Sequence, residues 1–185
     1  MRHVKGTLFV DYVRMLRGHK GVDWAQHLPP EDVALLHARI APDAWYPMDA
    51  FERLGNQILR FVAMHDLQAV RMWGRFSVDA LRHAQPALVA PGDPIETLNR
   101  FRVLRATFFD FDALDVLLLH DREAALVIRY HMGPEAEEAA AMQTLGFFER
   151  LLEVAGATAV RARFRTRAWI DEPRTLLAIT WADGG

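Results

Sequence analysis

The chain has 185 residues, of which 51% are hydrophobic and 25% are charged, with a formal net charge of −2 at pH 7. This length suits one compact domain with its own core, and the balance of apolar and charged residues excludes a disordered chain, a collagen and a coiled coil. The lack of cysteine excludes disulfides and thiolate-bound zinc or iron–sulfur sites, and the near-neutral charge argues against a dedicated nucleic-acid-binding domain.

Apolar residues recur at helical spacing through the first half of the chain. They predict helices near residues 8–16, 22–28, 33–40, 51–62, 67–81 and 95–109. Between the last two, Pro86, Pro91, Gly92 and Pro94 give the strongest loop signal in the chain. We therefore expect a helical half over residues 1–109.

In the second half of the chain, the spacing of apolar residues changes and predicts strands as well as a helix. Residues 114–120 and 124–132 predict a hairpin of two strands around a polar turn. Residues 135–155 predict a long helix with acids in its first turn and Gly156 just beyond its end, and residues 158–169 and 175–181 predict a closing hairpin. The fold class is α+β: one domain, 1–185, with a helical subdomain and a β-β-α-β-β subdomain, 110–185, whose antiparallel sheet packs on the long helix.

Nothing in the sequence indicates export or a membrane partner. No apolar run approaches the roughly 18 residues of a membrane span. The first residues lack the apolar core and small-residue cleavage site of a secretory signal. We therefore expect a cytoplasmic protein.

Several short motifs resemble known families. The Val-Lys-Gly-Thr opening at residues 4–7, Tyr46-Pro47 before a helix, and the β-β-α-β-β order resemble heme-nitric oxide/oxygen-binding (H-NOX) domains. Residues 146–156, Gly-Phe-Phe-Glu-Arg-Leu-Leu-Glu-Val-Ala-Gly, resemble the 4-vinyl reductase (V4R) domains, which share that fold. The chain is most similar to bacterial heme-less H-NOX-like proteins, and the resemblance implies an H-NOX-like fold over nearly its whole length.

The resemblance also implies where a heme would bind. H-NOX domains ligate heme iron through a histidine on the helix before the sheet. The matching helix here, 95–109, contains no histidine. Arg105 or a neighbour stands at the position of that ligand. They hold the propionates with Tyr-x-Ser-x-Arg, and the matching stretch, 130–134, keeps only Tyr130. Heme iron needs an axial ligand, so we expect no heme of the family type and no other cofactor. The paired cysteines of many V4R domains are absent as well.

In H-NOX-like folds a cavity lies between the helical half and the sheet. Without heme, it must be filled by side chains or by another apolar ligand. We expect bulky side chains to fill it, because an empty void costs roughly 24 cal/mol per Å³. The candidate lining residues are Phe101, Leu104, Phe108, Tyr130 and Phe148.

Arginine occupies every second position along the third predicted strand, namely Arg161, Arg163, Arg165 and Arg167. Successive side chains of a strand point to opposite faces, so all four are expected on one face, away from the core. Arg129 on the second strand is a candidate to join them. Such a row suits an anionic ligand or an acidic partner. The competing interpretation is a solvated outer face that prevents edge-to-edge aggregation.

Other polar residues are weaker candidates. His120 and His131 lie near the ends of two paired strands, where they could meet and bind a metal or remain two separate imidazoles, which we favour. Asp110, Asp112 and Asp115 are interpreted as capping and turn residues, because the glycine and glutamate of an EF-hand loop are missing.

No motif predicts catalysis. Phosphate-binding loops and the common hydrolase and metalloprotease motifs are absent, so an enzyme is the weakest hypothesis. We expect a non-catalytic signalling or scaffold module that acts through contact with a protein partner, or as a homodimer. The alternative is a sensor that binds a small apolar or anionic ligand in the former heme cavity.

Overall fold

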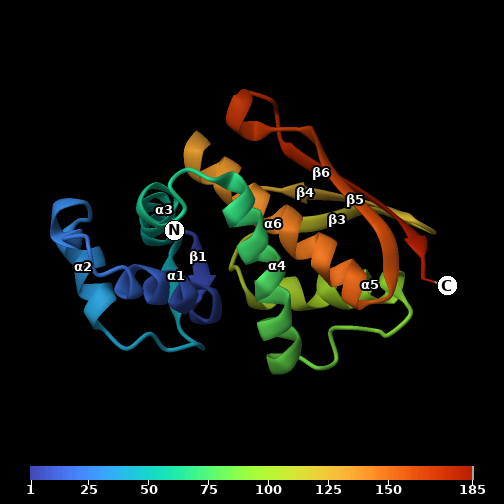
Figure 1. Cartoon of the computed structure of the whole chain (residues 1–185), viewed down its shortest axis with the longest axis horizontal. Coiled ribbons are helices and arrows are strands. Elements are labelled where there is room, and N and C mark those ends of the chain that lie inside the picture. The colour runs from blue at the N-terminus through green and yellow to red at the C-terminus, as the bar shows by residue number, and fades with distance from the viewer. Residues whose placement is uncertain (185) are drawn as a thin grey trace. The chain divides into compact units, whose positions relative to one another are not determined.

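The computed structural model describes residues 1–184 (Figure 1). The chain forms two compact units. The first comprises residues 1–66 and 106–111, and the second comprises residues 67–105 and the chain from 112 onward. Within residues 1–184, no helix combines the length and the apolar character needed to cross a bilayer.

The first unit is built of short helices around a small two-stranded sheet. The helices are α1 (Gly6–Gly18), η1 (Trp24–Gln26), α2 (Pro30–His37), α3 (Met48–Gln57) and the π-helical turn η2 (Ile58–Val62). The strands β1 (His3–Lys5) and β2 (Trp45–Pro47) pair antiparallel. Stacked rings hold this core together: Phe9 lies on Tyr46 with centroids 4.6 Å apart, and Tyr12 lies on Phe51 at 4.1 Å. The sequence did not predict β1 or β2, because three residues carry no readable period.

Strand β1 also holds the segment 106–111 that returns to this unit. The Lys5 amide donates to the Phe108 carbonyl at 2.8 Å. Asp110 accepts the His3 amide at 2.6 Å and lies 2.5 Å from the His3 Nδ1 atom. Burial alone would raise the pKa of Asp110, but the hydrogen bonds and charge of His3 outweigh it and lower that pKa below its ordinary 3.8.

The His3–Asp110 contact predicts an acid-dependent loss of stability. A carboxyl whose pKa is lowered by folding stabilises the folded state above its unfolded pKa and loses that contribution as the pH falls through its folded pKa. The free energy of unfolding of Asp110→Asn should therefore fall below that of the parent near pH 6, and the gap should close below pH 3.8. Urea unfolding between pH 3 and 7 measures this, and a gap of constant size would contradict it.

The second unit packs three helices with a four-stranded sheet. The helices are α4 (Leu67–Ala84), α5 (Pro94–Leu104) and α6 (Pro134–Val154). The strands are β3 (Leu114–His120), β4 (Glu123–Ile128), β5 (Ala157–Thr166) and β6 (Thr175–Asp183), in the antiparallel order β3-β4-β6-β5. Helix α6 covers one face of this sheet (Figure 1). The core lies there, with Phe148, Leu151, Leu152, Leu126, Leu177 and Ile179 fully buried.

Two glycines let α4 and α6 touch backbone to backbone. A Cβ atom on Gly74 would lie 1.9 Å from the carbonyl oxygen of Gln143, and one on Gly146 would lie 2.0 Å from that of Arg71. Each glycine therefore admits the other helix's main chain, which explains why both occur inside helices despite their cost there.

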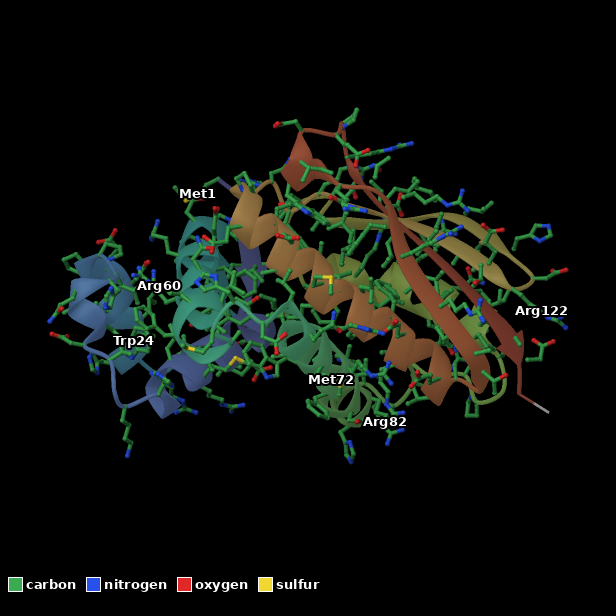
Figure 2. All side chains as sticks on the ribbon, turned by 45° about the horizontal axis from the view of Figure 1, so that its top comes forward. Met1, Trp24, Arg60, Met72, Arg82 and Arg122 are labelled. Atoms are coloured by element: carbon green, nitrogen blue, oxygen red, sulfur yellow. The ribbon has the colours of Figure 1, made fainter. Side chains whose placement is uncertain are left out.

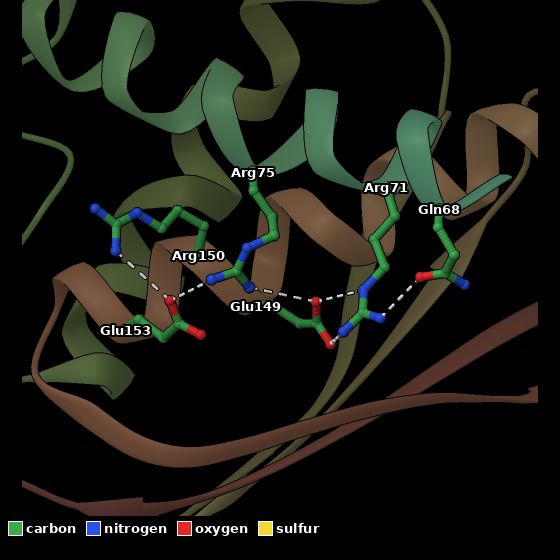
Figure 3. A network of polar contacts seen from close by, with 6 residues as sticks. All are labelled: Gln68, Arg71, Arg75, Glu149, Arg150 and Glu153. Atoms are coloured by element: carbon green, nitrogen blue, oxygen red, sulfur yellow. Dashed lines mark hydrogen bonds and ion pairs between the residues drawn. The ribbon is translucent and has the colours of Figure 1, made fainter. Parts of the chain in front are cut away.

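Beside the crossing runs a network of arginines and glutamates (Figure 3). Glu149, 4% exposed, accepts from Arg71 through both oxygens, at 2.7 and 2.9 Å, and from Arg75 at 3.4 Å. Arg75 continues to Glu153 at 2.7 Å. The network satisfies the buried carboxylate of Glu149 and ties α4 to α6.

The α+β class and the β-β-α-β-β order are confirmed, but several predicted ends move. The helix predicted to reach residue 109 ends at Leu104 and continues as the turn η3 (Arg105–Thr107). Strand β4 ends at Ile128, before His131, whose φ of 56° breaks the extended chain. Strand β5 ends at Thr166, before the turn η4 (Ala168–Ile170). The helix predicted over 22–28 is the single turn η1.

The division into units also differs from the predicted boundary at residue 109. Helices α4 and α5 belong to the unit that contains the sheet. Within that unit, α4 packs on α6 at the Gly74–Gly146 crossing.

Candidate functional site

The face of the sheet opposite α6 is the candidate site, which we call the outer face. Residues directly opposite each other in an antiparallel sheet point to the same side, so the register defines its members in rows across β3, β4, β6 and β5. One row is His120, Glu123, Thr180 and Arg161; the next is Leu118, Ala125, Ala178 and Arg163; the third is Asp115, Val127, Leu176 and Thr166.

The predicted arginine row lies along one edge of this outer face. Arg161, Arg163, Arg165 and Arg167 are all exposed, and they alternate with less exposed residues such as Phe164. The register shifts between Phe164 and Thr166, which gives β5 one extra residue there. Arg167 therefore falls outside the strand, as the residue before η4, and the regular alternation that grouped it with the others does not reach it.

These arginines differ in their partners. A guanidinium nitrogen of Arg165 lies 3.5 Å from a carboxylate oxygen of Glu123, with both side chains about half exposed. Because Glu123 is on β4, the Arg165 side chain crosses over β6 to reach it. Among residues 1–184, no carboxylate lies within 4 Å of the guanidinium of Arg161 or Arg163. Two unneutralised cations thus stand side by side at the edge.

The middle row of the outer face is small or apolar apart from Arg163. Ala125 and Ala178 occupy the centre of the middle row, between Arg163 on one edge strand and Leu118 on the other. Leu117 and Leu118, at the irregularity in β3, are each 46% exposed. Arginines along β5 and two exposed leucines on β3, between His120 and Asp115, make this face suited to contact with another surface.

Arg129 comes two residues after Val127 of the outer face, and its amide donates to the Ala113 carbonyl at 2.8 Å. It follows the end of β4, and its guanidinium lies 3.8 Å from a carboxylate oxygen of Asp112. Arg105 lies 3.0 Å from Asp115 and 4.0 Å from Asp112. Asp112, before β3, and Asp115, inside it, are thus paired with arginines. The interpretation of Asp115 as a turn residue is wrong, because it pairs with Val127 in the sheet.

The predicted cavity-lining residues fall in different places. Phe101 and Phe148 are buried together in the second unit, with their rings edge to face at 4.8 Å, and Phe147 joins them. Leu104 is half-buried at the end of α5. Phe108 is buried in the first unit, where its carbonyl accepts from Lys5.

Tyr130 lies in a fully hydrogen-bonded setting in the second unit. Its hydroxyl bonds the Thr144 hydroxyl at 2.7 Å. Its amide donates to the Glu137 carboxylate at 3.3 Å, and the Met132 amide donates to the same carboxylate at 3.0 Å. Glu137 is 4% exposed. Sequence reasoning missed Glu137, because an acid in the first turn of a helix usually faces water. The one signal in the sequence that could have related Glu137 to Tyr130 is their separation of seven residues.

His120 and His131 do not meet. His120 pairs with Glu123 at the start of β4, whereas His131 follows the far end of that strand. The six residues of β4 separate them, so the idea that they approach one another is wrong. Among residues 1–184 there is no cluster of three or more histidines and acids with metal-binding geometry.

No protein-family model matches the sequence, and no curated protein sequence matches it. Solved structures do match, at low sequence identity. An H-NOX protein from S. oneidensis in the Fe(II) state aligns with a TM-score of 0.65 and 14% identity, covering 98% of this chain and 97% of that one. The chain has the H-NOX fold. Identity this low establishes the fold alone.

Other H-NOX structures agree. An Fe(II) unliganded H-NOX mutant from K. algicida aligns with a TM-score of 0.64 and 13% identity, covering 97% of both chains. An oxygen-binding H-NOX domain related to soluble guanylate cyclases aligns with a TM-score of 0.63 and 14% identity, covering 97% of this chain and 96% of that one. The resemblance drawn from residues 4–7 and 46–47 is thereby confirmed for the H-NOX-like fold.

Proposed function

We propose that this chain is a non-catalytic module that uses the H-NOX fold without the heme of its structural neighbours and signals through contact with a protein partner. The observation that carries the proposal is the outer face of the sheet, where Arg161 and Arg163 stand exposed and unneutralised beside small and apolar side chains. The alternative is a sensor that binds a small apolar or anionic molecule inside the fold.

The helix α5 supports the proposal, because it offers no ligand to heme iron. It contains neither histidine, cysteine, methionine nor tyrosine, the usual axial ligands. The resemblance places Arg105 or a neighbour in the register of the proximal histidine, and the Arg105 guanidinium is held by Asp115 at 3.0 Å. Phe101 on the same helix packs its ring against Phe148. A heme ligated as in the H-NOX family does not fit these residues.

The residues after β4 support it independently. Heme propionates are anionic and require hydrogen-bond donors or cations. Here the amides of Tyr130 and Met132 donate to the buried Glu137 carboxylate, and the Tyr130 hydroxyl is bonded to Thr144. A second carboxylate brought to this place would meet the first, and like charges in a poorly solvated site repel strongly. The hydrogen-bond donors that a propionate would need here are therefore already bonded to groups of the chain itself.

Charge reversal on the outer face tests the contact role. The double variant Arg161→Glu/Arg163→Glu should lose partner binding while folding normally, because exposed substitutions usually change stability by less than about 0.5 kcal/mol. The matched control is Arg82→Glu/Arg102→Glu, which changes net charge equally on exposed parts of α4 and α5; Arg82 is labelled in Figure 2. Affinity purification from the source cells, with recovered proteins identified and quantified by mass spectrometry, is the measurement.

A defined set of proteins should be recovered with the parent and the control, and lost with the outer-face variant. Recovery with the parent should fall as salt rises, since exposed charges are screened over about 8 Å at physiological ionic strength. If the outer-face variant folds and keeps every interaction, the arginines are a solvated surface and the proposed contact role is wrong. Circular dichroism of each variant confirms the fold.

A further inference from the structure

We propose that the outer face takes one amphipathic helix of a partner protein, with acidic residues along the flank that meets Arg161, Arg163 and Arg165 and apolar residues toward Leu117 and Leu118. This inference rests on the proposed contact function and names the chemistry of the partner.

The width of the outer face fits one helix. Four strands lie across it, so the columns of Arg163 and Leu118 are three strand spacings apart. At about 4.8 Å per spacing this distance is about 14 Å. An α-helix with its side chains is about 10–12 Å wide. Ala125 and Ala178 lie between the two columns, and Ala178 is buried. A helix can therefore lie low on the sheet, with its flanks touching the arginines and the leucines, once the longer side chains that cover Ala178 move aside.

The charge spacing also fits a helix. Alternate residues of a strand are about 6.8 Å apart, so Arg161 and Arg163 present cations at that interval. Helix residues four apart are separated by about 6 Å along the axis, so acids at positions i and i+4 can each meet one arginine through a charge-assisted hydrogen bond. The flexible arginine side chain takes up the difference of less than 1 Å.

An added β-strand fits less well. It would have to pair with the free edge of β5 or of β3. Strand β5 has register shifts near both ends, between Thr158 and Arg161 and between Phe164 and Thr166, and β3 has one at Leu117. Such irregularities interrupt the regular ladder that an incoming strand needs. A helix that lies on the outer face does not need such a ladder.

Glu123 acts as an internal competitor. It is the carboxylate of the outer face that reaches Arg165, at 3.5 Å, and the pair is exposed and therefore weak. A partner carboxylate can replace it, which would free the Arg165 side chain from its path across β6. The other titratable side chains of the outer-face rows are His120, in the same row as Glu123, and Asp115, which is held by Arg105. Removing the Glu123 charge should therefore strengthen binding.

The test uses the full chain and a defined probe. The probe is a fluorescein-labelled peptide of about 18 residues, long enough to form a helix in water, with Glu at i, i+4 and i+8 on one flank and Leu on the next. Binding is followed by fluorescence anisotropy at two salt concentrations. A second peptide with the same leucines and Lys in place of Glu is the control. Backbone amide chemical shifts locate the contact.

The acidic peptide should bind, and the amide chemical shifts of the protein that change on binding should be those of Ala125, Ala178 and Leu118. Arg161→Glu/Arg163→Glu should weaken binding at least about tenfold, while Arg82→Glu/Arg102→Glu should change it less than about twofold. Glu123→Gln should tighten binding, whereas Glu96→Gln, an equal loss of charge on α5, should leave it unchanged.

The inference would be overturned by no binding of the acidic peptide up to about 1 mM, by equal binding of the lysine peptide, or by chemical-shift changes that map elsewhere. Tighter binding of a single-stranded oligonucleotide would do the same. These failures are distinct from failure of the proposed function. If cellular interactions are lost on arginine reversal but the helix does not bind, the contact role stands and the partner has another shape.

Discussion

Gly146→Ala is expected to destabilise the second unit by at least about 3 kcal/mol, the upper part of the range for overpacking a closely packed interior. The added Cβ would lie 2.0 Å from the Arg71 carbonyl oxygen and 2.9 Å from its carbon. Both atoms belong to the main chain of α4, so the clash cannot be relieved by a side-chain rotation. The helices must separate, which breaks the fully buried packing around Phe148 and strains the bonds to Glu149.

Urea unfolding followed by circular dichroism measures the effect. Gly18→Ala is the matched control, because Gly18 ends α1 and a Cβ there would meet nothing within 4 Å. That variant should be neutral or more stable, by up to about 1 kcal/mol, since alanine restricts the unfolded chain. Gly74→Ala should behave like Gly146→Ala, with its Cβ 1.9 Å from the Gln143 oxygen. Similar stabilities of the Gly146 and Gly18 variants would show that the helices do not cross as described.

Glu149→Ala should cost about 3 kcal/mol, the lower end of the range for breaking a buried ion pair, because the two arginines that remain are partly exposed. Glu149 is 4% exposed and accepts from Arg71 through both oxygens (Figure 3). Its loss leaves Arg71 and Arg75 with reduced neutralisation beside the helix crossing. Glu149→Gln keeps the volume and should still be clearly destabilising, because an amide offers a single acceptor oxygen.

A double-mutant cycle separates the pair from packing effects. Arg71→Leu, Glu149→Leu and the double variant should give a coupling energy above about 1 kcal/mol, as expected for bidentate pairs in contact. The exposed pair Arg100–Glu96, at 2.9 Å on α5, is the control and should couple by no more than about 0.5 kcal/mol. Equal coupling in the two cycles would mean that burial of Glu149 contributes nothing.

The sequence predicts elements with strong periods and misses contacts between distant positions. The strand 114–120 and the helix ending before Gly156 are recovered because their patterns are long and their ends carry turn residues. The α4–α6 crossing is not predictable in this way. A lone glycine such as Gly74 indicates only a low helix propensity at that position. Nothing in the neighbouring sequence shows that the carbonyl of residue 143, from another helix, occupies the space where a Cβ atom would lie.

The candidate site follows the same rule. Alternation along residues 161–165 predicts an arginine edge, because a strand's period fixes its faces. The bulge before Thr166 and the approach of Glu123 to Arg165 depend on how three strands pair. That pairing register cannot be deduced from the sequence of any one strand. The same limit hides Glu137, whose burial depends on the amides of Tyr130 and Met132 turning toward α6.

Titration of the purified protein with hemin, followed by visible absorption, tests the central claim most directly. The claim is that this chain has the H-NOX fold but lacks the means to hold heme as H-NOX domains do. We expect no saturable, stoichiometric shift of the Soret band, because α5 has no axial ligand and Glu137 occupies the donors after β4. A saturable one-to-one complex would contradict the claim, and its loss on His120→Ala or His131→Ala would show that iron ligation has moved to that histidine.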